Sequence, residues 1–419
     1  MNERVSIKEP LAALIVFLVL LFAFLAVDQL GAQSVPVTGT ADVSSIEARL
    51  TGIEARLSAL ENTTQPPVDP DPDPEPPTAS GVIGMNSGFV WRSGGSHPDD
   101  PTDAGYFDLL KPVCAAYRPM NWNRINDFNR EVDSIDAAHQ YTSKTWRDAL
   151  LAQVAVCNGV GADFYFNTPV KATPKFVTES VALIRSAIHD DARIYVTYAN
   201  ECWLPGRYPY DYLKATSGTD PGGGDNAFFD LWALKLDMVF EAARKADPAC
   251  IRVVETKTAR DGTWYTEQIT GRMKSSFDAV AGTFYFGPHY SAYKPGVTAA
   301  ELLDAAEDEW LNDDRKWQEA NIKWAMDRNL LALGYEAGQH YHQYGYEAQT
   351  RACQTDLRMA EQYELVYGNA LEKGADLIID FDFIDWDNEH GHWGKDDELS
   401  GLTSSIKYQV VKKIATQQN

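Results

Sequence analysis

Two glutamates that lie far apart in the sequence each close a short apolar run, and their type and setting suit acid–base chemistry. The run 193–205 (RIYVTYANECWLP) alternates β-branched and aromatic residues and then reaches Glu201. The run 330–340 (LLALGYEAGQH) is also apolar and reaches Glu336. A carboxylate at the end of an apolar strand costs free energy unless it has partners or a task. Two such carboxylates in one cleft would be the catalytic pair of a glycosidase.

The elements that must position these residues are short apolar runs alternating with helical stretches from residue 81 onward. The pattern predicts a closed parallel (β/α)8 barrel of the TIM type, and a doubly wound open sheet is the alternative. An open sheet usually has a glycine-rich phosphate loop after its first strand, and SGFVWRSGGSHPDD does not match that motif. The predicted strands are Val82–Asn86, Tyr117–Asn121, Ala162–Asn167, Ile194–Asn200, Ile251–Glu255, Val280–Phe286, Leu331–Glu336 and Leu377–Asp382. The predicted helices are Trp146–Cys157, Pro174–His189, Phe228–Ala246, Ala300–Asn329 and Arg351–Lys373.

Catalytic groups of such barrels gather where the strands end. Glu201 would end the fourth strand and Glu336 the seventh, so we expect them to face each other across the mouth. A separation of about 5 Å would make a retaining hydrolase. The acid must keep its proton near neutral pH, and Cys202 and Trp203 would supply an apolar setting for Glu201.

A nucleophilic carboxylate at Glu336 needs hydrogen-bond donors nearby. Arg118, Tyr285 and Tyr290 fall at or near predicted strand ends and could reach it. Glu255 ends the fifth strand and is the main competitor for a catalytic role.

Other residues have plainer readings. The pairs His340/His342 and His390/His392 resemble metal ligands, but we interpret loop histidines near a sugar cleft as hydrogen-bond donors, so no metal and no cofactor is expected. The sequence has five cysteines and no C-x-x-C pair, which argues against a zinc site. Cys202 is interpreted as a buried apolar residue.

Several motifs resemble one family, the clan A retaining glycoside hydrolases. ANECW resembles their Asn-Glu motif on strand four, and YEAGQH resembles their nucleophile motif on strand seven. YRPMNWNRIN and GTFYFGPHY look like the strand-two and strand-six segments of a bacterial branch described as cellulose-binding or hydrolase-like. The segment from Asp380 through HGHWG looks like strand eight with its Trp. The likeness covers residues 81–419.

The resemblance implies a retaining hydrolase of β-linked glycans in which Glu201 is the acid/base and Glu336 the nucleophile. It further implies that Asn200 holds the sugar 2-hydroxyl. Arg118 and either Tyr285 or Tyr290 would orient Glu336, and Trp386 or Trp393 would floor the subsite nearest the cleaved bond. The remaining substrate-binding residues expected in these segments are Trp122, Trp203 and His289. Two positions depart from the pattern: Ala337 stands where relatives carry Gly, and Thr197 where the branch is often acidic.

The first 32 residues predict a cytoplasmic tip and a membrane anchor. An unbroken apolar run spans residues 11–27, with Arg4 and Lys8 before it and Arg49 as the next basic residue. Because basic residues stay in the cytoplasm, the rest of the chain would lie outside the cell. Cleavage of a signal peptide after Ala32 is the alternative, but Leu30 is a poor match to the small residue that such a site needs. Both interpretations place the barrel outside the cytoplasm. An uncleaved anchor would hold it at the membrane, with the lipid bilayer as a partner, and a cleaved signal peptide would leave it secreted.

Two further segments separate this anchor from the barrel. Residues 42–61 contain the near-exact heptad repeat IEARLTG-IEARLSA, which predicts a short coiled coil whose seam, 46–60, would allow a homo-oligomer; a single amphipathic helix is the alternative. Residues 62–80 alternate Pro with acidic residues and predict an extended linker, at ~3.1 Å per residue. We interpret it as a stalk.

The composition narrows the range of partners. A formal net charge of -23 repels phosphate backbones and argues against nucleic-acid binding. The 11 Trp and 20 Tyr fit a cleft in which sugar faces stack on aromatic rings, so a polysaccharide or oligosaccharide is the expected substrate. The alternative function is a carbohydrate-binding surface protein or adhesin on the same barrel with little or no activity.

Overall fold

The computed structural model describes residues 83–86, 104–120, 123–126, 128–139, 144–221, 226–258, 263–384, 392–396 and 401–417. The chain divides into two units, Met1–Pro74 and Glu75–Asn419, and every described residue belongs to the second. The predicted anchor, coiled coil and linker lie outside the described residues. No helix in the described ranges combines the length and apolar character that crossing a membrane requires.

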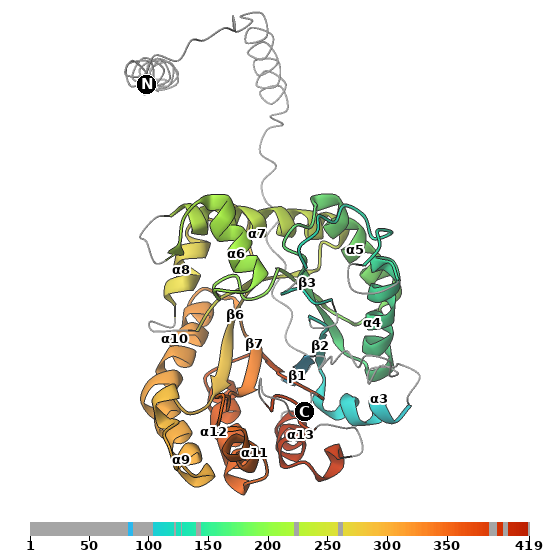
Figure 1. The fold of residues 1–419 in the computed structure, drawn as a ribbon. Coiled ribbons are helices and arrows are strands. Elements are labelled where there is room, and N and C mark those ends of the chain that lie inside the picture. Colours follow the sequence, from blue (N-terminus) through green and yellow to red (C-terminus); the bar gives the residue numbers. More distant parts are fainter. Residues whose placement is uncertain are drawn as a thin grey trace, which may run out of the picture. The chain divides into compact units, whose positions relative to one another are not determined.

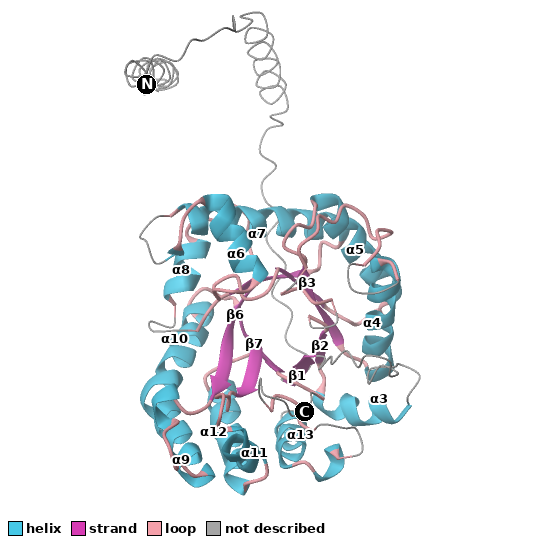
Figure 2. Cartoon of the chain, in the orientation of Figure 1, coloured by secondary structure: helices cyan, strands magenta, loops and turns pink. Residues whose placement is uncertain are grey.

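Within these ranges, eight parallel strands close into a barrel in sequence order, β1 to β8. Each strand pairs with the next, and β8 pairs with β1. Figure 2 shows the strands as a ring with the helices outside it. The predicted (β/α)8 barrel is confirmed. The strands are β1 (Ile83–Asn86), β2 (Ala116–Arg118), β3 (Asp163–Thr168), β4 (Ile194–Tyr198), β5 (Ile251–Glu255), β6 (Ala279–Phe286), β7 (Leu331–Gln339) and β8 (Leu377–Asp380).

Helices follow the strands and cover the outside of the barrel (Figure 1). They are α3 (Ala104–Leu110), α4 (Trp146–Val160), α5 (Pro174–Ala187), α6 (Tyr208–Ser217), α7 (Ala227–Ala246), α8 (Trp264–Thr270), α9 (Ala299–Glu309), α10 (Arg315–Met326), α11 (Glu347–Gln354), α12 (Leu357–Glu372) and α13 (Ile406–Gln417). Short turns of helix are η1 (Lys111–Val113), η3 (Tyr290–Ala292), η4 (Trp310–Asp314) and η5 (Leu402–Ser404).

Local sequence sets several of the helix boundaries. Thr145 starts α4 with a capping box completed by Asp148, and Thr298 does the same for α9 with Glu301. The prediction of one helix over 300–329 was wrong, because the π-helical turn η4 separates α9 from α10. The predicted helix 351–373 is also two helices, since Asp356 caps a new start at α12.

Side chains alternate between two cores along the strands. One buried cluster contains strand residues alone: Ala116, Tyr165, Tyr195, Ile251, Val253, Ala279, Ala281, Leu331, Leu333, Tyr335, Leu377 and Ile379. Their neighbours in sequence, such as Phe164, Val196 and Ala332, join a larger cluster with the helices. The first cluster therefore fills the interior of the barrel, and the second lies between the strands and the helices.

The strands end at different points from those predicted near the two glutamates. β4 ends at Tyr198, before Asn200, because Ala199 adopts a positive φ of 53°. β7 does not end at Glu336 but continues through Gln339. β2 ends at Arg118 and β8 at Asp380, each short of the prediction.

Candidate active site

Glu336 reaches the barrel interior because β7 carries an extra residue. Opposite β6, Gly282 pairs with Gly334 but Thr283 pairs with Glu336, so Tyr335 has no partner of its own. Such a bulge breaks the alternation of side chains. Tyr335 and Glu336 consequently both face the mouth of the barrel, although they are consecutive in sequence.

Two donors hold the Glu336 carboxyl group, one at each oxygen. Arg118 Nη1 donates to Oε1 at 2.9 Å, and the Tyr285 hydroxyl donates to Oε2 at 2.9 Å. Glu336 is only 3% exposed. Arg118 comes from the end of β2 and Tyr285 from β6, so three strands fix the orientation of this side chain. The pair of donors suits a carboxylate that attacks as an anion.

Glu201 lies just beyond β4 on a strained turn. Ala199 and Glu201 have φ values of 53° and 47°, the left-handed region that residues with a Cβ avoid. Asn167 Nδ2 donates to the Ala199 carbonyl at 2.6 Å and fixes the turn from β3. Strain of this kind costs on the order of 1–3 kcal/mol per residue and is concentrated at functional sites.

The environment of Glu201 favours its protonated form. Burial, followed by the negative charge of Glu336, raises the pKa of Glu201 to about 8. Arg207 opposes this shift from the solvent side, with Nε 3.4 Å from Oε2. The negative charge of Glu336 is thus the main charge effect that disfavours ionisation of Glu201. At neutral pH Glu201 therefore holds the proton that a general acid needs.

Arg118 is the common partner of the residues around the mouth. Besides Glu336, it donates through Nη1 to Asn86 Oδ1 at 2.9 Å and through Nη2 to Asn200 Oδ1 at 2.6 Å. Its guanidinium lies 5.0 Å from the centroid of the Tyr335 ring. Arg118 is fully buried, so its planar group fixes several side chains at once.

Asn200 is buried beside Glu201 and is held at both ends of its amide. Its oxygen accepts from Arg118, and its Nδ2 donates to Asn126 Oδ1 at 3.0 Å. Asn200 thus has a fixed orientation next to the candidate acid, as a residue that contacts substrate would need.

Glu255 belongs to the same network. It accepts from Arg118 Nη2 at 3.1 Å and from Asn167 Nδ2 at 3.1 Å, and it is 5% exposed. Burial raises the pKa of Glu255 to about 7, against the lowering effect of Arg118. Glu255 and Glu336 therefore share the Arg118 guanidinium, each through a different Nη atom.

Aromatic side chains line the mouth on two sides. The Trp393 ring stacks on His340 at 4.8 Å and lies 5.8 Å from Tyr285. On the other side, Trp203 Nε1 donates to the Tyr335 hydroxyl at 3.1 Å, and Lys257 Nζ lies 5.1 Å above the Trp203 ring. Both tryptophans are therefore tied to residues adjacent to Glu336.

Some predicted residues are placed elsewhere or cannot be placed. Tyr290 is 74% exposed on η3, and the hydrogen bonds among the described residues join Tyr285, not Tyr290, to Glu336. His289 is exposed and bonds through Nδ1 to Ser291 Oγ at 2.9 Å. Trp122 and Trp386 lie outside the described residues. Across the described ranges, no group of three or more His, Cys, Asp or Glu side chains could hold a metal ion, and Cys202 is buried.

Sequence reasoning missed the polar residues that support the catalytic candidates. Asn86 and Asn167 each lie at or next to the end of a predicted strand, which was the available signal, while Asn126 lies in a loop. Tyr335 gave no signal, because the bulge that brings it to the mouth is a property of the pairing between β6 and β7.

The described residues thus form a parallel eight-stranded barrel that carries Glu201 just beyond β4 and Glu336 on β7. The fold is similar to that of the alpha-L-arabinofuranosidase from Thermotoga maritima, with a TM-score of 0.52 at 13% identity over 81% of this chain and 71% of that chain. The thermostable GH51 alpha-L-arabinofuranosidase from Thermotoga petrophila RKU-1 is similar to the same degree, with a TM-score of 0.51 at 12% identity over 80% and 70% of the two chains. The fold expected from the resemblance to clan A is thus confirmed. No protein-family model matches the sequence, and no curated protein sequence does.

Proposed function

We propose that the barrel is a retaining glycoside hydrolase that acts on β-linked glycans, with Glu336 as nucleophile and Glu201 as acid/base. The observation that carries the proposal is the contrast between the two carboxyl groups. Glu336 accepts a hydrogen bond on each oxygen, from Arg118 and Tyr285. Glu201 faces it with a pKa raised to about 8 by burial and by Glu336 itself. One carboxylate and one carboxylic acid in the same mouth form the pair that double displacement requires.

The reaction would proceed in two balanced steps. In the first, a Glu336 oxygen bonds to the anomeric carbon while the bond from that carbon to the glycosidic oxygen breaks, and Glu201 gives its proton to the departing oxygen. In the second, Glu201 takes a proton from water as the water oxygen bonds to the anomeric carbon, and Glu336 leaves as a carboxylate. Glu201 ends each cycle protonated, as its environment favours.

The surrounding residues would bind the sugar. Asn200, fixed by Arg118 and Asn126, would contact the 2-hydroxyl beside the reacting carbon. Trp393 would floor the subsite of the cleaved bond, since its ring lies beside Tyr285, which contacts Glu336. Trp203 would line the opposite side of the mouth.

The location of the enzyme is part of the proposal. The apolar run 11–27, with basic residues before it, supports a membrane anchor that places the barrel outside the cytoplasm. Secretion after cleavage of a signal peptide is the alternative. If the barrel is anchored outside the cytoplasm, protease added to intact cells should cleave the chain and release the barrel. Digestion only after lysis would reject both the anchored and the secreted form.

The function is tested by offering the full chain a panel of β-linked glycans and aryl β-glycosides. The panel includes α-L-arabinofuranosides, because the solved structures that share the fold are alpha-L-arabinofuranosidases. For any substrate cleaved, NMR of the first product should show the anomeric configuration of the substrate. An inverted product would contradict the assignment of Glu336 as nucleophile. Binding on a glycan array without cleavage of any bound glycan would instead support the carbohydrate-binding alternative.

A further inference from the structure

The segment of residues 392–395, here called the Trp393 segment, carries an aromatic ring beside the residues that contact Glu336. The Trp393 ring packs against His340 at 4.8 Å and Phe381 at 5.7 Å. It lies 5.8 Å from Tyr285, the donor to Glu336. Residues 392–395 belong to no helix or strand, and an isolated bridge to Ile384 follows at Asp396, so the position of the segment depends on other contacts.

Backbone hydrogen bonds join the Trp393 segment to the chain that follows β8. The Asp382 amide donates to the Trp393 carbonyl at 3.0 Å. The Lys395 amide donates to the Asp382 and Phe383 carbonyls, each at 3.0 Å. These bonds join one side of the segment to the chain after β8. The carbonyls of His392, Gly394 and Lys395 need other hydrogen-bond donors.

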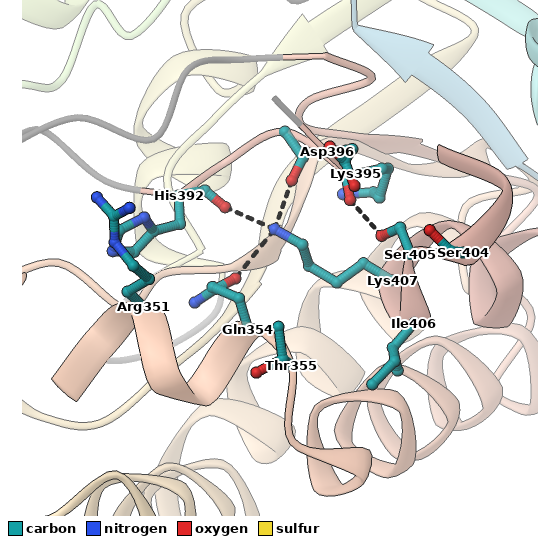
Figure 3. A pocket seen from close by; sticks show the side chains of 11 residues that line it. Arg351, Gln354, Thr355, His392, Lys395, Asp396, Ser404, Ser405, Ile406 and Lys407 are labelled. Atoms are coloured by element: carbon teal, nitrogen blue, oxygen red, sulfur yellow. Dashed lines mark hydrogen bonds between the residues drawn. The ribbon is translucent and has the colours of Figure 1, made fainter. Parts of the chain in front are cut away.

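Lys407, on α13, satisfies those carbonyls. Its Nζ donates to the His392 carbonyl at 2.8 Å, to the Gly394 carbonyl and to Gln354 Oε1 at 3.0 Å. Figure 3 shows the ammonium group pointing between the Trp393 segment and α11, at the edge of a cavity of about 450 Å³. An ammonium has three donors, and these three oxygens use all of them. Lys407 is 5% exposed, so its hydrogen bonds form away from bulk water.

Three more side chains hold the same segment. Gln339 Nε2 donates to the His392 carbonyl at 2.5 Å from the end of β7, and the Ser405 hydroxyl donates to the Lys395 carbonyl. The Lys395 ammonium lies 3.1 Å from Asp380 Oδ1 at the end of β8, and both side chains are fully buried. Residues of α13, β7 and β8 thus all bind this segment.

We propose that Lys407 and Lys395 are positioning residues of the active site, which hold the Trp393 segment so that the Trp393 ring presents a fixed face to the sugar. The proposal rests on the proposed function, because it assigns the Trp393 ring to sugar binding. Neither lysine would touch substrate. Each lysine would restrict the conformations of the segment before the sugar binds, which lowers the entropy cost of binding.

The test compares Lys407→Met with Lys413→Met in the full chain. Methionine keeps the length and apolar stem of Lys407 but has no donor. Lys413 lies on the same helix, is half-exposed, and within the described part of the chain forms an ion pair with Glu364 at 2.6 Å. Hydrogen exchange at the Asp382 and Lys395 amides reports whether the segment is held, and steady-state kinetics on a cleaved glycan report the consequence. In Lys407→Met we expect exchange at these amides to rise about tenfold or more. We expect KM to rise about tenfold with kcat changed less than about threefold, because stacking on Trp393 serves ground state and transition state alike.

Lys413→Met should leave both readouts unchanged, and Lys407→Arg, which keeps charge and donors, should recover part of the KM. Wild-type exchange or wild-type KM in folded Lys407→Met would overturn the proposal. Should Lys407→Met fail to fold, Ser405→Ala removes a single donor to the same segment, and unchanged exchange in that variant would overturn it equally. Wild-type protein that cleaves no glycan would contradict the proposed function instead, and the exchange rates would still decide whether the segment is held.

Discussion

The ends of β4 and β7 present the same side chain in two different settings. At β7 a bulge aims Glu336 at Arg118 and Tyr285, and both carboxyl oxygens accept a short hydrogen bond. Beyond β4 a turn with two left-handed residues carries Glu201, whose side chain is 11% exposed and, among the described residues, pairs with the half-exposed Arg207 at 3.4 Å.

In the proposed reaction, environment and not residue type would therefore assign the roles of acid and nucleophile. Burial beside a like charge keeps the proton on Glu201, because ionising it would place a second negative charge near Glu336. Glu336 has the cation and the hydroxyl that a carboxylate needs. Four substitution experiments test this contrast between Glu336 and Glu201, beginning with the variant that should lose the most activity.

The largest effect is expected at Glu336, whose carboxyl group accepts two hydrogen bonds. Glu336→Gln keeps the shape of the side chain but removes the nucleophile, so kcat/KM should fall by at least about 10⁴-fold. Glu255→Gln weakens one hydrogen bond that Arg118 donates, so kcat/KM should fall only about 10–100-fold, the value of one hydrogen bond to a charged group. Both are measured on the best substrate from the panel, with circular dichroism as the control for folding. Equal losses in the two variants would mean that Glu255 shares the catalytic role.

Substitution of Glu201 should affect substrates differently, according to whether their leaving group needs a proton. Glu201→Gln cannot donate a proton, so hydrolysis of a glycan with a poor leaving group should fall by about 10²–10⁴-fold. Formation of the glycosyl-enzyme from a dinitrophenyl glycoside, whose leaving group needs no proton, should change far less. Burst kinetics separate the two steps. A uniform loss on both substrates would remove Glu201 from the role of acid.

A smaller effect is expected from one donor to Glu336. Tyr285→Phe removes the hydroxyl 2.9 Å from Oε2 and should lower kcat/KM about 10–100-fold. Tyr290→Phe is the matched control, because that side chain is 74% exposed and its removal should have no measurable effect. Sensitivity to Tyr290 in place of Tyr285 would mean that the loop carrying η3 closes over the substrate.

The smallest effect is a shift in pH dependence. Because the pKa of Glu201 is raised to about 8, the acid form is present below that pH, and kcat/KM should fall as the pH rises through it. Arg207 lowers this pKa, so Arg207→Met should move the alkaline limb to higher pH, by less than about one unit because the side chain is 48% exposed. Lys214→Met, another exposed cation near this loop, is the control. A limb that moves to lower pH in Arg207→Met would contradict the assignment.

The sequence predicted more of the fold than of the site. Each predicted strand has a counterpart, because apolar β-branched runs between helices have few alternatives once a barrel closes. The helix 300–329 was mispredicted as continuous, since its apolar period runs on through the π-helical turn η4. The supporting amides Asn86, Asn126 and Asn167 were missed because a polar residue near a strand end looks the same whether it meets solvent or a buried guanidinium.

The N-terminal predictions remain predictions. The anchor 11–27, the heptad seam 46–60 and the linker 62–80 lie outside the described residues, and so do Trp122 and Trp386. Their patterns are local and need no tertiary contact to be recognised, so each can be tested separately from the barrel.

Strand periodicity and chain order were enough to predict the barrel and to place the two glutamates near the carboxyl ends of β4 and β7, because they fix which side chains meet at one rim. It is the packing of the folded chain that joins Tyr285, not Tyr290, to Glu336, that pairs Glu255 with Arg118, and that brings Tyr335 to the mouth beside Glu336. Those outcomes depend on a one-residue slip between β6 and β7 and on where a single buried guanidinium finds its acceptors. Both are set by packing between segments more than 30 residues apart, which local pattern does not encode.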